Sequence, residues 1–368
     1  MTQKIPFGDL SREYHELKTD IDAAVARVLE SGWFVLGQEV AEFEREFAAY
    51  LGARHAVGVG NGTDAIRIAL EACGVGPGDE VVTVPFTAVP TVTAISMLGA
   101  VPRFVDVGPE TATLDAARLG EALSERTRAI VPVHLYGCPC DMAPTMAVAQ
   151  EADIPVVEDV AQAHGAAYKG RKVGTFGRAG CFSFYPSKNL GAYGDGGAVV
   201  TDDDELAERC RMLRNYGQRR RYEHVTAGVN SRLDELQAAI LRAKLPHLER
   251  WNARRRAIAA RWDAAISGES VRPLSRREGH VCHLYVVACR ERQGLQSFLE
   301  SQGIGTQIHY PTPVHLQPAY RYLGLAAGAF PVSERLAESV LSLPMYPYLT
   351  EAEVERVAEA LREFCAGC

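Results

Sequence analysis

The sequence lacks the features that mark membrane-spanning, secreted and metal-binding proteins. No apolar run reaches the roughly 18 residues that a membrane-spanning helix needs. The segment from Met1 to Asp9 contains no apolar signal region, so we expect the nine cysteines to be reduced thiols in the cytoplasm rather than a disulfide framework. No cluster of His, Cys and Asp has the spacing of a zinc site, and we expect no bound metal.

A strong charge of either sign is lacking as well. The 368 residues include 39 Lys and Arg against 46 Asp and Glu, a formal charge of −7, which argues against nucleic acid or an anionic membrane as a partner. A hydrophobic share of 47% and a charged share of 23% exclude disorder, collagen-like repeats and a coiled coil as the overall description. At about 150 residues per domain, the length predicts two domains.

Short Val- and Ile-rich runs alternate with helical patterns over the first 200 residues or so. Because these runs are almost continuously apolar, we expect them to be buried on both faces of a mostly parallel sheet between helices. The predicted strands are residues 55–59, 80–84, 103–107, 129–135, 154–158, 181–185 and 197–201.

The pattern changes after about residue 203. Arg-rich helices are predicted over residues 204–213 and 233–265, and a smaller α/β unit follows, with strands at 284–289 and 305–309 and a closing helix at 351–364. We therefore predict a large domain of residues 1–245, including two N-terminal helices, and a small C-terminal domain of residues 246–368.

The first candidate site is a glycine turn, Gly58-Val-Gly60-Asn61-Gly62-Thr63. It follows a predicted strand and opens a helix, where free N–H groups suit a phosphate. Gly62 permits close backbone approach, and the Thr63 hydroxyl can add a hydrogen bond. The dinucleotide fingerprint G-x-G-x-x-G is incomplete because Thr63 holds its last position, which counts against a nucleotide-dependent oxidoreductase. A strand–helix corner without a ligand fits this stretch equally well.

The second candidate is a pair of acids, Glu158 and Asp159, at the end of an apolar strand. Parallel sheets place ligand-binding groups at the carboxyl ends of their strands. Because side chains alternate along a strand, one acid can face a ligand while the other faces a helix or solvent. On this stretch alone, capping of the next helix is the favoured role of Asp159.

The third candidate is Lys188, in a turn that follows Ser183 and precedes a glycine-rich loop. Such a lysine suits a Schiff-base amine. A solvated surface lysine is the alternative, but aromatic and apolar residues precede Lys188, and the stretch is not a charged face.

The three candidates together are more specific than any one of them. A phosphate turn, a strand-end Asp and a Lys 29 residues after it match the needs of pyridoxal phosphate (PLP). Its phosphate requires N–H and hydroxyl donors, its pyridine nitrogen a carboxylate and its aldehyde a lysine. The sequence therefore predicts a PLP enzyme.

The chain resembles the sugar aminotransferases of the DegT/DnrJ/EryC1/StrS family, which are PLP enzymes of fold type I. The resemblance implies an α/β fold like that of aspartate aminotransferase, with a mostly parallel central sheet between helices and a smaller C-terminal α/β domain. It extends over nearly the whole chain, and its motifs include Gly60-Asn-Gly-Thr-Asp-Ala-Ile, Glu158-Asp-Val-Ala-Gln-Ala-His-Gly, Ser183-Phe-Tyr-Pro-Ser-Lys-Asn-Leu-Gly, Asn230-Ser-Arg-Leu-Asp-Glu-Leu-Gln and His309-Tyr-Pro-Thr-Pro-Val-His.

The resemblance also implies roles for individual residues. Lys188 bonds the cofactor aldehyde and later moves the proton, and Asp159 pairs with the pyridine nitrogen. The other cofactor residues are Phe86 on the ring face, Gln162 near the ring hydroxyl, and Gly62, Thr63 and Ser183 on the phosphate. Asn230 reaches the phosphate of the partner subunit, so a homodimer with shared active sites is expected.

The substrate side combines residue chemistry with the same resemblance. Six arginines fall within the 13 residues 209–221, which contain no acid and suggest recognition of an anion such as a nucleotide diphosphate. A solvated helix face is the alternative. The expected sugar-binding residues are Tyr185, Arg219, Tyr222, His309 and Tyr310, with Arg219 and Tyr222 serving the other subunit.

The predicted function is transfer of an amino group from L-glutamate to a dTDP- or UDP-linked keto-deoxy sugar, with 2-oxoglutarate as the second product. The runs around Lys188 and His309 look like the branch of the family that aminates 3-keto sugars. A 4-keto aminotransferase and a non-catalytic PLP-binding regulator are the alternatives.

Overall fold

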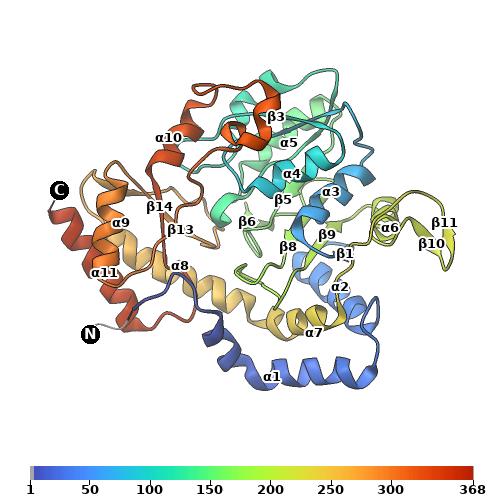
Figure 1. The fold of residues 1–368 in the computed structure, drawn as a ribbon, viewed down its shortest axis with the longest axis horizontal. Helices are drawn as coiled ribbons and strands as arrows, with labels where there is room; N and C mark the ends of the chain where they lie inside the picture. Colours follow the sequence, from blue (N-terminus) through green and yellow to red (C-terminus); the bar gives the residue numbers. More distant parts are fainter. Residues whose placement is uncertain (1–3, 368) are drawn as a thin grey trace.

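The computed structural model describes residues 4–367. Two helices, α1 (Leu10–Ser31) and α2 (Gln38–Leu51), precede the first strand. The Asp9 side chain caps α1 by accepting from the N–H groups of Ser11 and Arg12, and Gly32 ends the helix at φ 64°. Both helices pack against α7 (Glu235–Lys244), in the lower part of Figure 1.

The central sheet is built from two sets of strands. One set has the order β1 (His55–Val59), β9 (Gly197–Thr201), β8 (Ala179–Ser183) and β5 (Val157–Asp159), and the other the order β3 (Val101–Phe104), β2 (Glu80–Thr83) and β4 (Thr127–Ile130). Parallel bridges from Ile130 to Val156 and from Val133 to Asp159 join the two sets.

Strand β9 runs antiparallel to its neighbours β1 and β8, and the other pairs in this sheet are parallel. The prediction of a mostly parallel sheet is therefore confirmed. Residues 184–196 join β8 to β9 without a crossover helix, so β9 returns beside β8 in the opposite direction.

Alternate residues of the strands enter two separate apolar cores. On β8, Cys181 belongs to the core that contains α3 (Gly62–Ala72) and α6 (Asp204–Leu213), whereas Phe182 belongs to the core on the α2 side. Val199 and Val200 of β9 divide in the same way. The strands are thus buried on both faces, as their apolar sequences predict. Two further helices, α4 (Val89–Met97) and α5 (Met142–Glu151), follow β2 and β4.

The chain after α7 builds a second, smaller sheet. A 3-10 turn at Leu245–His247 separates α7 from α8 (Leu248–Ala265), because Pro246 inside it offers no N–H to a helical ladder. The antiparallel sheet has the order β12 (Val271–Pro273), β13 (Tyr285–Cys289), β14 (Val340–Leu343). It lies on the left of Figure 1 with α9 (Arg292–Ser301), α10 (Pro331–Ser339) and α11 (Glu351–Ala366).

The predicted strand at 305–309 is wrong. Its backbone groups pair with two different segments, the Gly305 N–H with the Ile5 carbonyl and the Gln307 N–H with the Ser342 carbonyl, so no continuous ladder forms. This irregular segment instead brings His309 and Tyr310 to a cavity.

Two searches over residues 4–367 gave negative results. No helix there is long and apolar enough to cross a membrane. No group of three or more His, Cys, Asp or Glu side chains in that range could hold a metal ion.

Candidate active site

Five predicted site residues meet in one cavity of about 580 Å³. Its wall combines the N-terminal segment before α1, the end of β5, the turn after β8 and residues of the C-terminal part. The predicted residues that line it are Gln162, Tyr185, Lys188, His309 and Tyr310.

Lys188 stands in the turn that the sequence predicted after β8. Its N–H donates to the Tyr185 carbonyl at 2.9 Å, which closes the turn. Burial among its neighbours lowers the pKa of the Lys188 amine to about 8, and the negative charge of Asp159 partly opposes that shift. The amine is therefore easier to deprotonate than that of a solvated lysine.

Asp159 ends β5 and is 5% exposed. Its Oδ2 accepts from the Thr91 hydroxyl at 2.8 Å, and its Oδ1 accepts from the Ala161 N–H at 3.0 Å. No helix follows directly, because the chain turns at Val160–Ala163, so the helix-cap alternative is wrong. The hydrogen bond from the Ala161 N–H to Oδ1 caps this turn, and Oδ2 faces Thr91 in the first turn of α4.

Glu158 points to the other side of the strand, as alternation requires, but not to a helix or solvent. It is fully buried and accepts from the N–H groups of Gly174, Phe176 and Gly177 at 2.7–2.8 Å. The His134 Nε2 lies 3.1 Å from the Glu158 Oε2, and the His134 Nδ1 accepts from the Cys140 N–H. This acid fixes a loop, which corrects the expectation for it.

The glycine turn and Ser183 lie against one another. A Cβ placed on Gly62 would be 2.5 Å from the Ser183 Cβ, so only glycine fits there. Gly62 and Thr63 begin α3, and their N–H groups have no intrahelical partner. Among residues 4–367 no hydrogen bond engages the Thr63 hydroxyl. The geometry supplies the N–H and hydroxyl donors that a phosphate needs.

Gln162 links two residues around the cavity. Its Oε1 accepts from the Tyr136 N–H at 2.7 Å, and its Nε2 donates to the Tyr310 hydroxyl at 3.0 Å. The Tyr136 hydroxyl donates to the His309 carbonyl, and Phe7 stacks on the His309 ring at 5.6 Å. Sequence reasoning did not assign Tyr136 or Phe7 to the site.

His309 and Tyr310 are uncharged near neutral pH. Burial lowers the pKa of His309 to about 4 and raises that of Tyr310 to about 12. They offer hydrogen bonds without charge, which suits the hydroxyl groups of a sugar. Phe86 is fully buried in the core beneath the α2 side of the sheet and does not line the cavity.

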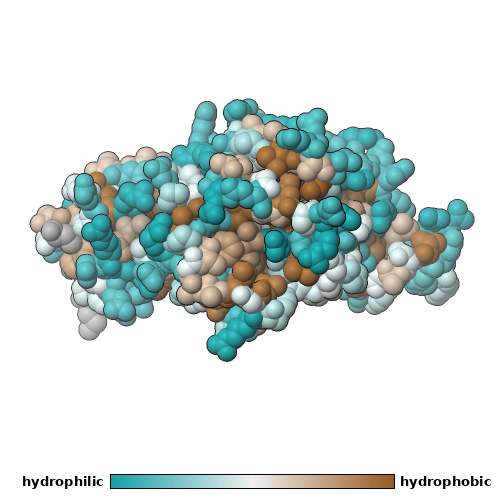
Figure 2. All heavy atoms as spheres, turned by 90° about the horizontal axis from the view of Figure 1, so that it is seen from above, coloured by the Kyte–Doolittle hydropathy of each residue, from teal (hydrophilic) through white to brown (hydrophobic). Residues whose placement is uncertain are grey.

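Eight predicted residues do not line this cavity. Gly62, Thr63, Phe86, Asp159 and Ser183 belong to the neighbouring strand ends and turns, whereas Arg219, Tyr222 and Asn230 lie on the surface. Arg219 and Tyr222 belong to a hairpin of β10 (Gln218–Arg220) and β11 (Glu223–His224), which projects on the right of Figure 1. Tyr222 is 81% exposed, and Asn230 is exposed too. Figure 2 shows apolar side chains gathered at the same end of the molecule as well as in the middle of the face it presents.

The arginine cluster divides in two. Arg214 is buried, and its Nη1 donates to the Gly58 carbonyl at 2.7 Å and to Glu44, so it supports the glycine turn from within the protein. Arg219, Arg220 and Arg221 remain exposed. Only the exposed members are available to an outside anion.

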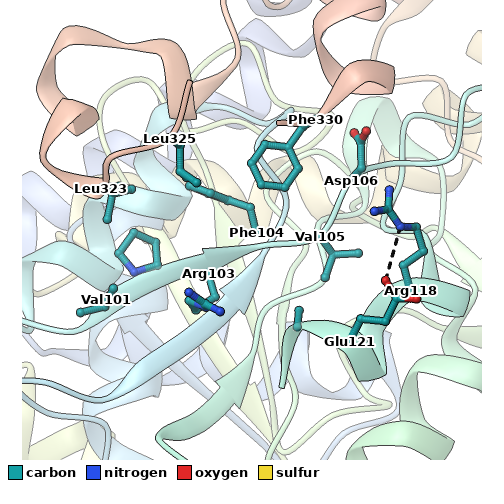
Figure 3. Close-up of a pocket in the computed structure, with 12 residues that line it drawn as sticks. Val101, Arg103, Phe104, Val105, Asp106, Arg118, Glu121, Leu323, Leu325 and Phe330 are labelled. Atoms are coloured by element: carbon teal, nitrogen blue, oxygen red, sulfur yellow. Dashed lines mark ion pairs between the residues drawn. The ribbon is translucent and has the colours of Figure 1, made fainter. Parts of the chain in front are cut away.

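A second cavity, of about 310 Å³, lies between β3 and the segment before α10 (Figure 3). Phe104 and Phe330 meet there edge to face at 5.8 Å, and Arg118 pairs with Glu121 at 3.9 Å. Its twelve lining residues include no predicted site residue. We therefore place the candidate site at the Lys188 cavity.

Comparison with known proteins gave one family and close relatives. A model of the DegT/DnrJ/EryC1/StrS aminotransferase family matches residues 15–362. A dTDP-3-amino-3,4,6-trideoxy-alpha-D-glucose transaminase of Streptomyces venezuelae is 48% identical over 366 residues, covering 99% of this chain and 97% of the relative.

Two solved structures share the fold over nearly the full chain. The crystal structure of S. venezuelae DesV in complex with a ketimine intermediate has a TM-score of 0.97 at 48% identity and covers 99% of each chain. The structure of NtdA from Bacillus subtilis with bound cofactor PMP has a TM-score of 0.94 at 31% identity and covers 100% of this chain and 86% of that one.

Proposed function

Because the chain belongs to the DegT/DnrJ/EryC1/StrS aminotransferase family, we propose that it is a PLP-dependent transaminase that aminates a nucleotide-linked keto-deoxy sugar. The amino donor is L-glutamate, and the acceptor is the 3-keto position of a dTDP- or UDP-linked sugar. The observation that carries the proposal is the cavity itself, in which Lys188, with its lowered pKa, and Gln162 line a space closed by uncharged sugar-binding groups. The S. venezuelae relative, named for a 3-amino sugar, supports the 3-keto position over the 4-keto alternative.

The residues present fit PLP at each of its three polar ends. Gly62 and Thr63 offer unengaged N–H and hydroxyl groups for the phosphate, and the Ser183 hydroxyl, which accepts from the Tyr185 N–H at 3.3 Å, can still donate to it. Asp159 offers a buried carboxylate for the pyridine nitrogen. Lys188 offers the amine for the aldehyde, with Phe86 and Gln162 assigned to the ring. When bound, PLP supplies an electron sink for the carbon that gains or loses the amino group.

Each residue then has a defined task. Lys188 carries the proton to and from the reacting carbon, which its pKa of about 8 permits near neutral pH. Asp159 would pair with the ring nitrogen, and the Thr91 hydroxyl orients its Oδ2. Tyr185, His309 and Tyr310 line the cavity and receive the sugar.

We further propose a homodimer in which Asn230, Arg219 and Tyr222 serve the partner's site. Their exposure supports this, as does the exposed apolar loop of Trp33, Phe34 and Val35, because monomers rarely leave such groups open to water. A same-chain role for Asn230 is the competing alternative, since the next residue, Ser231, accepts from the Gly60 N–H at 3.0 Å.

The remaining proposals concern the parts of the chain and its place in the cell. We propose a large domain of residues 1–245 and a small domain of residues 246–368, supported by the separate apolar core that gathers α8, α9, β13 and α11. A cytoplasmic enzyme fits the absence of disulfides among the described residues.

The test uses the purified protein loaded with PLP. We expect an absorption band that borohydride abolishes and that L-glutamate bleaches, followed by amination of a dTDP- or UDP-linked 3-keto sugar. Amination of only 4-keto sugars would favour the alternative specificity. A band that L-glutamate leaves unchanged would indicate a regulator that binds PLP without catalysis.

A further inference from the structure

The wall of the Lys188 cavity contains a buried guanidinium, that of Arg255 on α8. The residue is 6% exposed and lines the same cavity as Lys188. Its Nη1 donates to the Met345 carbonyl at 2.5 Å and to the His283 carbonyl at 3.4 Å. Backbone carbonyls carry no formal charge, so these bonds give the guanidinium no ion-pair partner, although the nearby negative charge of Glu13 partly opposes the lowering of its pKa.

No acid pairs with Arg255 among residues 4–367. The other buried arginines of the described chain differ in this respect, since Arg67 lies 3.3 Å from Glu71 and Arg214 pairs with Glu44. The Arg255 Nε is buried and has no hydrogen-bond partner. Burial lowers the pKa of Arg255 to about 10, which reflects the cost of an unpaired buried cation.

The acids that line the cavity are already engaged elsewhere. Asp9 lies 3.1 Å from Arg12, and Glu13 pairs with the buried Lys244. Each acid therefore forms its ion pair with another cation, and neither forms one with Arg255, although the negative charge of Glu13 acts on the guanidinium from a distance. An anionic group entering the cavity would supply the ion-pair partner that Arg255 lacks.

The guanidinium has donors that a carboxylate can use. Nη1 donates to the two carbonyls, and no hydrogen bond among residues 4–367 engages Nε or Nη2, so these two groups remain to donate to a carboxylate. The hydroxyls of Tyr346 and Tyr348, which line the same cavity, are also buried without partners. These groups add donors on the same wall.

We propose that Arg255 binds a carboxylate of the amino donor. The inference rests on the proposed transaminase function and assigns to this residue the recognition of the amino acid, a role separate from binding of the sugar. An uncharged sugar ring offers Arg255 no counter-charge, whereas an amino-acid donor brings a carboxylate in every turnover.

The first test measures binding without turnover, with glutarate as the probe on the PLP-loaded enzyme. In Arg255→Gln we expect glutarate to bind at least tenfold more weakly, about 1.4 kcal/mol. The matched control is Arg254→Gln on the same helix, because Arg254 also donates to a backbone carbonyl, that of Leu349, but does not line the cavity. This control should bind glutarate within twofold of the unmodified enzyme. Equal glutarate affinity in folded Arg255→Gln and the unmodified enzyme would overturn the proposal.

A second test needs no variant and so cannot fail through misfolding. The unmodified enzyme should bind glutarate at least tenfold more tightly than glutaramide, which has the same length but no charge. Equal binding of the two probes would overturn the proposal. Because neither probe can react, this result is independent of whether the enzyme aminates a sugar.

A third measurement identifies the carboxylate by comparing L-glutamate with L-glutamine as donors. Loss of both donors to the same extent in Arg255→Gln would assign Arg255 to the α-carboxylate. Loss of L-glutamate alone would assign it to the side-chain carboxylate, and loss of neither would overturn the proposal. Should the unmodified enzyme bind glutarate yet aminate no keto sugar, the proposed function would fail while the carboxylate site remained.

Discussion

The buried residues Asp159 and Gln162 of the candidate site and the hairpin that carries Arg219 and Tyr222 differ in how their side chains are held. Asp159 and Gln162 are buried, and the chain itself fixes their orientation through Thr91 and Tyr136. The hairpin side chains extend into solvent. Under the proposed function, one chain positions the groups for the cofactor by itself, and the shared-site proposal assigns part of the substrate binding to a second copy.

The largest loss of activity is expected from Lys188→Ala. Without the amine no group moves the proton at the reacting carbon, and we expect no detectable turnover in a steady-state assay with L-glutamate and the keto sugar. Binding of the cofactor already joined to an amino group should persist, since the phosphate and ring contacts are intact. Turnover near that of the unmodified enzyme would refute the assignment.

Gly62→Ala tests the phosphate cradle in the same region. The added methyl would lie 2.5 Å from the Ser183 Cβ, so the turn or Ser183 must shift. Overpacking of this kind costs about 1–3 kcal/mol, and we expect PLP affinity to fall roughly tenfold to a hundredfold. Gly120→Ala is the control, because no atom lies within 4 Å of its added methyl and the residue does not line the Lys188 cavity. Unchanged PLP affinity in Gly62→Ala would remove the phosphate from this turn.

Asp159→Asn tests whether Asp159 acts through its negative charge or only by capping the turn that follows β5. An amide can cap the turn through its oxygen about as well as the carboxylate, but it cannot stabilise a protonated ring nitrogen. We expect turnover to fall by at least about tenfold, or 1.4 kcal/mol in barrier, with the thermal unfolding midpoint little changed. A rate equal to that of the unmodified enzyme would mean that Asp159 serves only the turn.

The effect expected on stability follows from the pKa of Lys188. The folded pKa of about 8 lies below the ordinary 10.5, so the cofactor-free protein disfavours the charged amine. Below pH 8 the folded state bears this cost in full, and above about pH 10.5 it bears none. At about 1.4 kcal/mol per pH unit, the difference between 10.5 and about 8 sets an upper limit of about 3 kcal/mol. We therefore expect Lys188→Met to stabilise the cofactor-free protein at pH 7 by about 1–3 kcal/mol, with the gain disappearing toward pH 11. A gain that is the same at both pH values would argue for better packing instead.

Local sequence was enough to predict the elements in which contacts are close along the chain. The turn around Lys188 and the acid at the end of β5 are short continuous motifs, and the buried strands are recognisable from their apolar runs. Thr91 was missed because its contact with Asp159 spans 68 residues, and Tyr136 because its contact with His309 spans 173. The direction of β9 depends on the missing crossover helix rather than on its own residues.

The C-terminal part was predicted less well for a related reason. The false strand at 305–309 contains two β-branched residues, Thr306 and Ile308, which favour strands. Its backbone partners are Ile5 and Ser342, which no local pattern indicates. Strand β14 was not predicted, although Val340–Leu343 is fully buried. Arg255 could not be distinguished from its neighbours Arg254 and Arg256 until burial separated them.

The central claim is that a second copy completes the site, and mixed dimers test it most directly. Lys188→Ala and Asn230→Ala are refolded together and the mixed dimers isolated, after each variant alone has been shown to be severely impaired. One pocket of the mixed dimer then holds both intact residues and the other holds both defects. The account predicts recovery toward one working site in two. If mixed dimers form but activity never exceeds that of the separate variants, Asn230 acts within its own chain, as the contact of Ser231 with Gly60 would allow, and the shared-site account is contradicted.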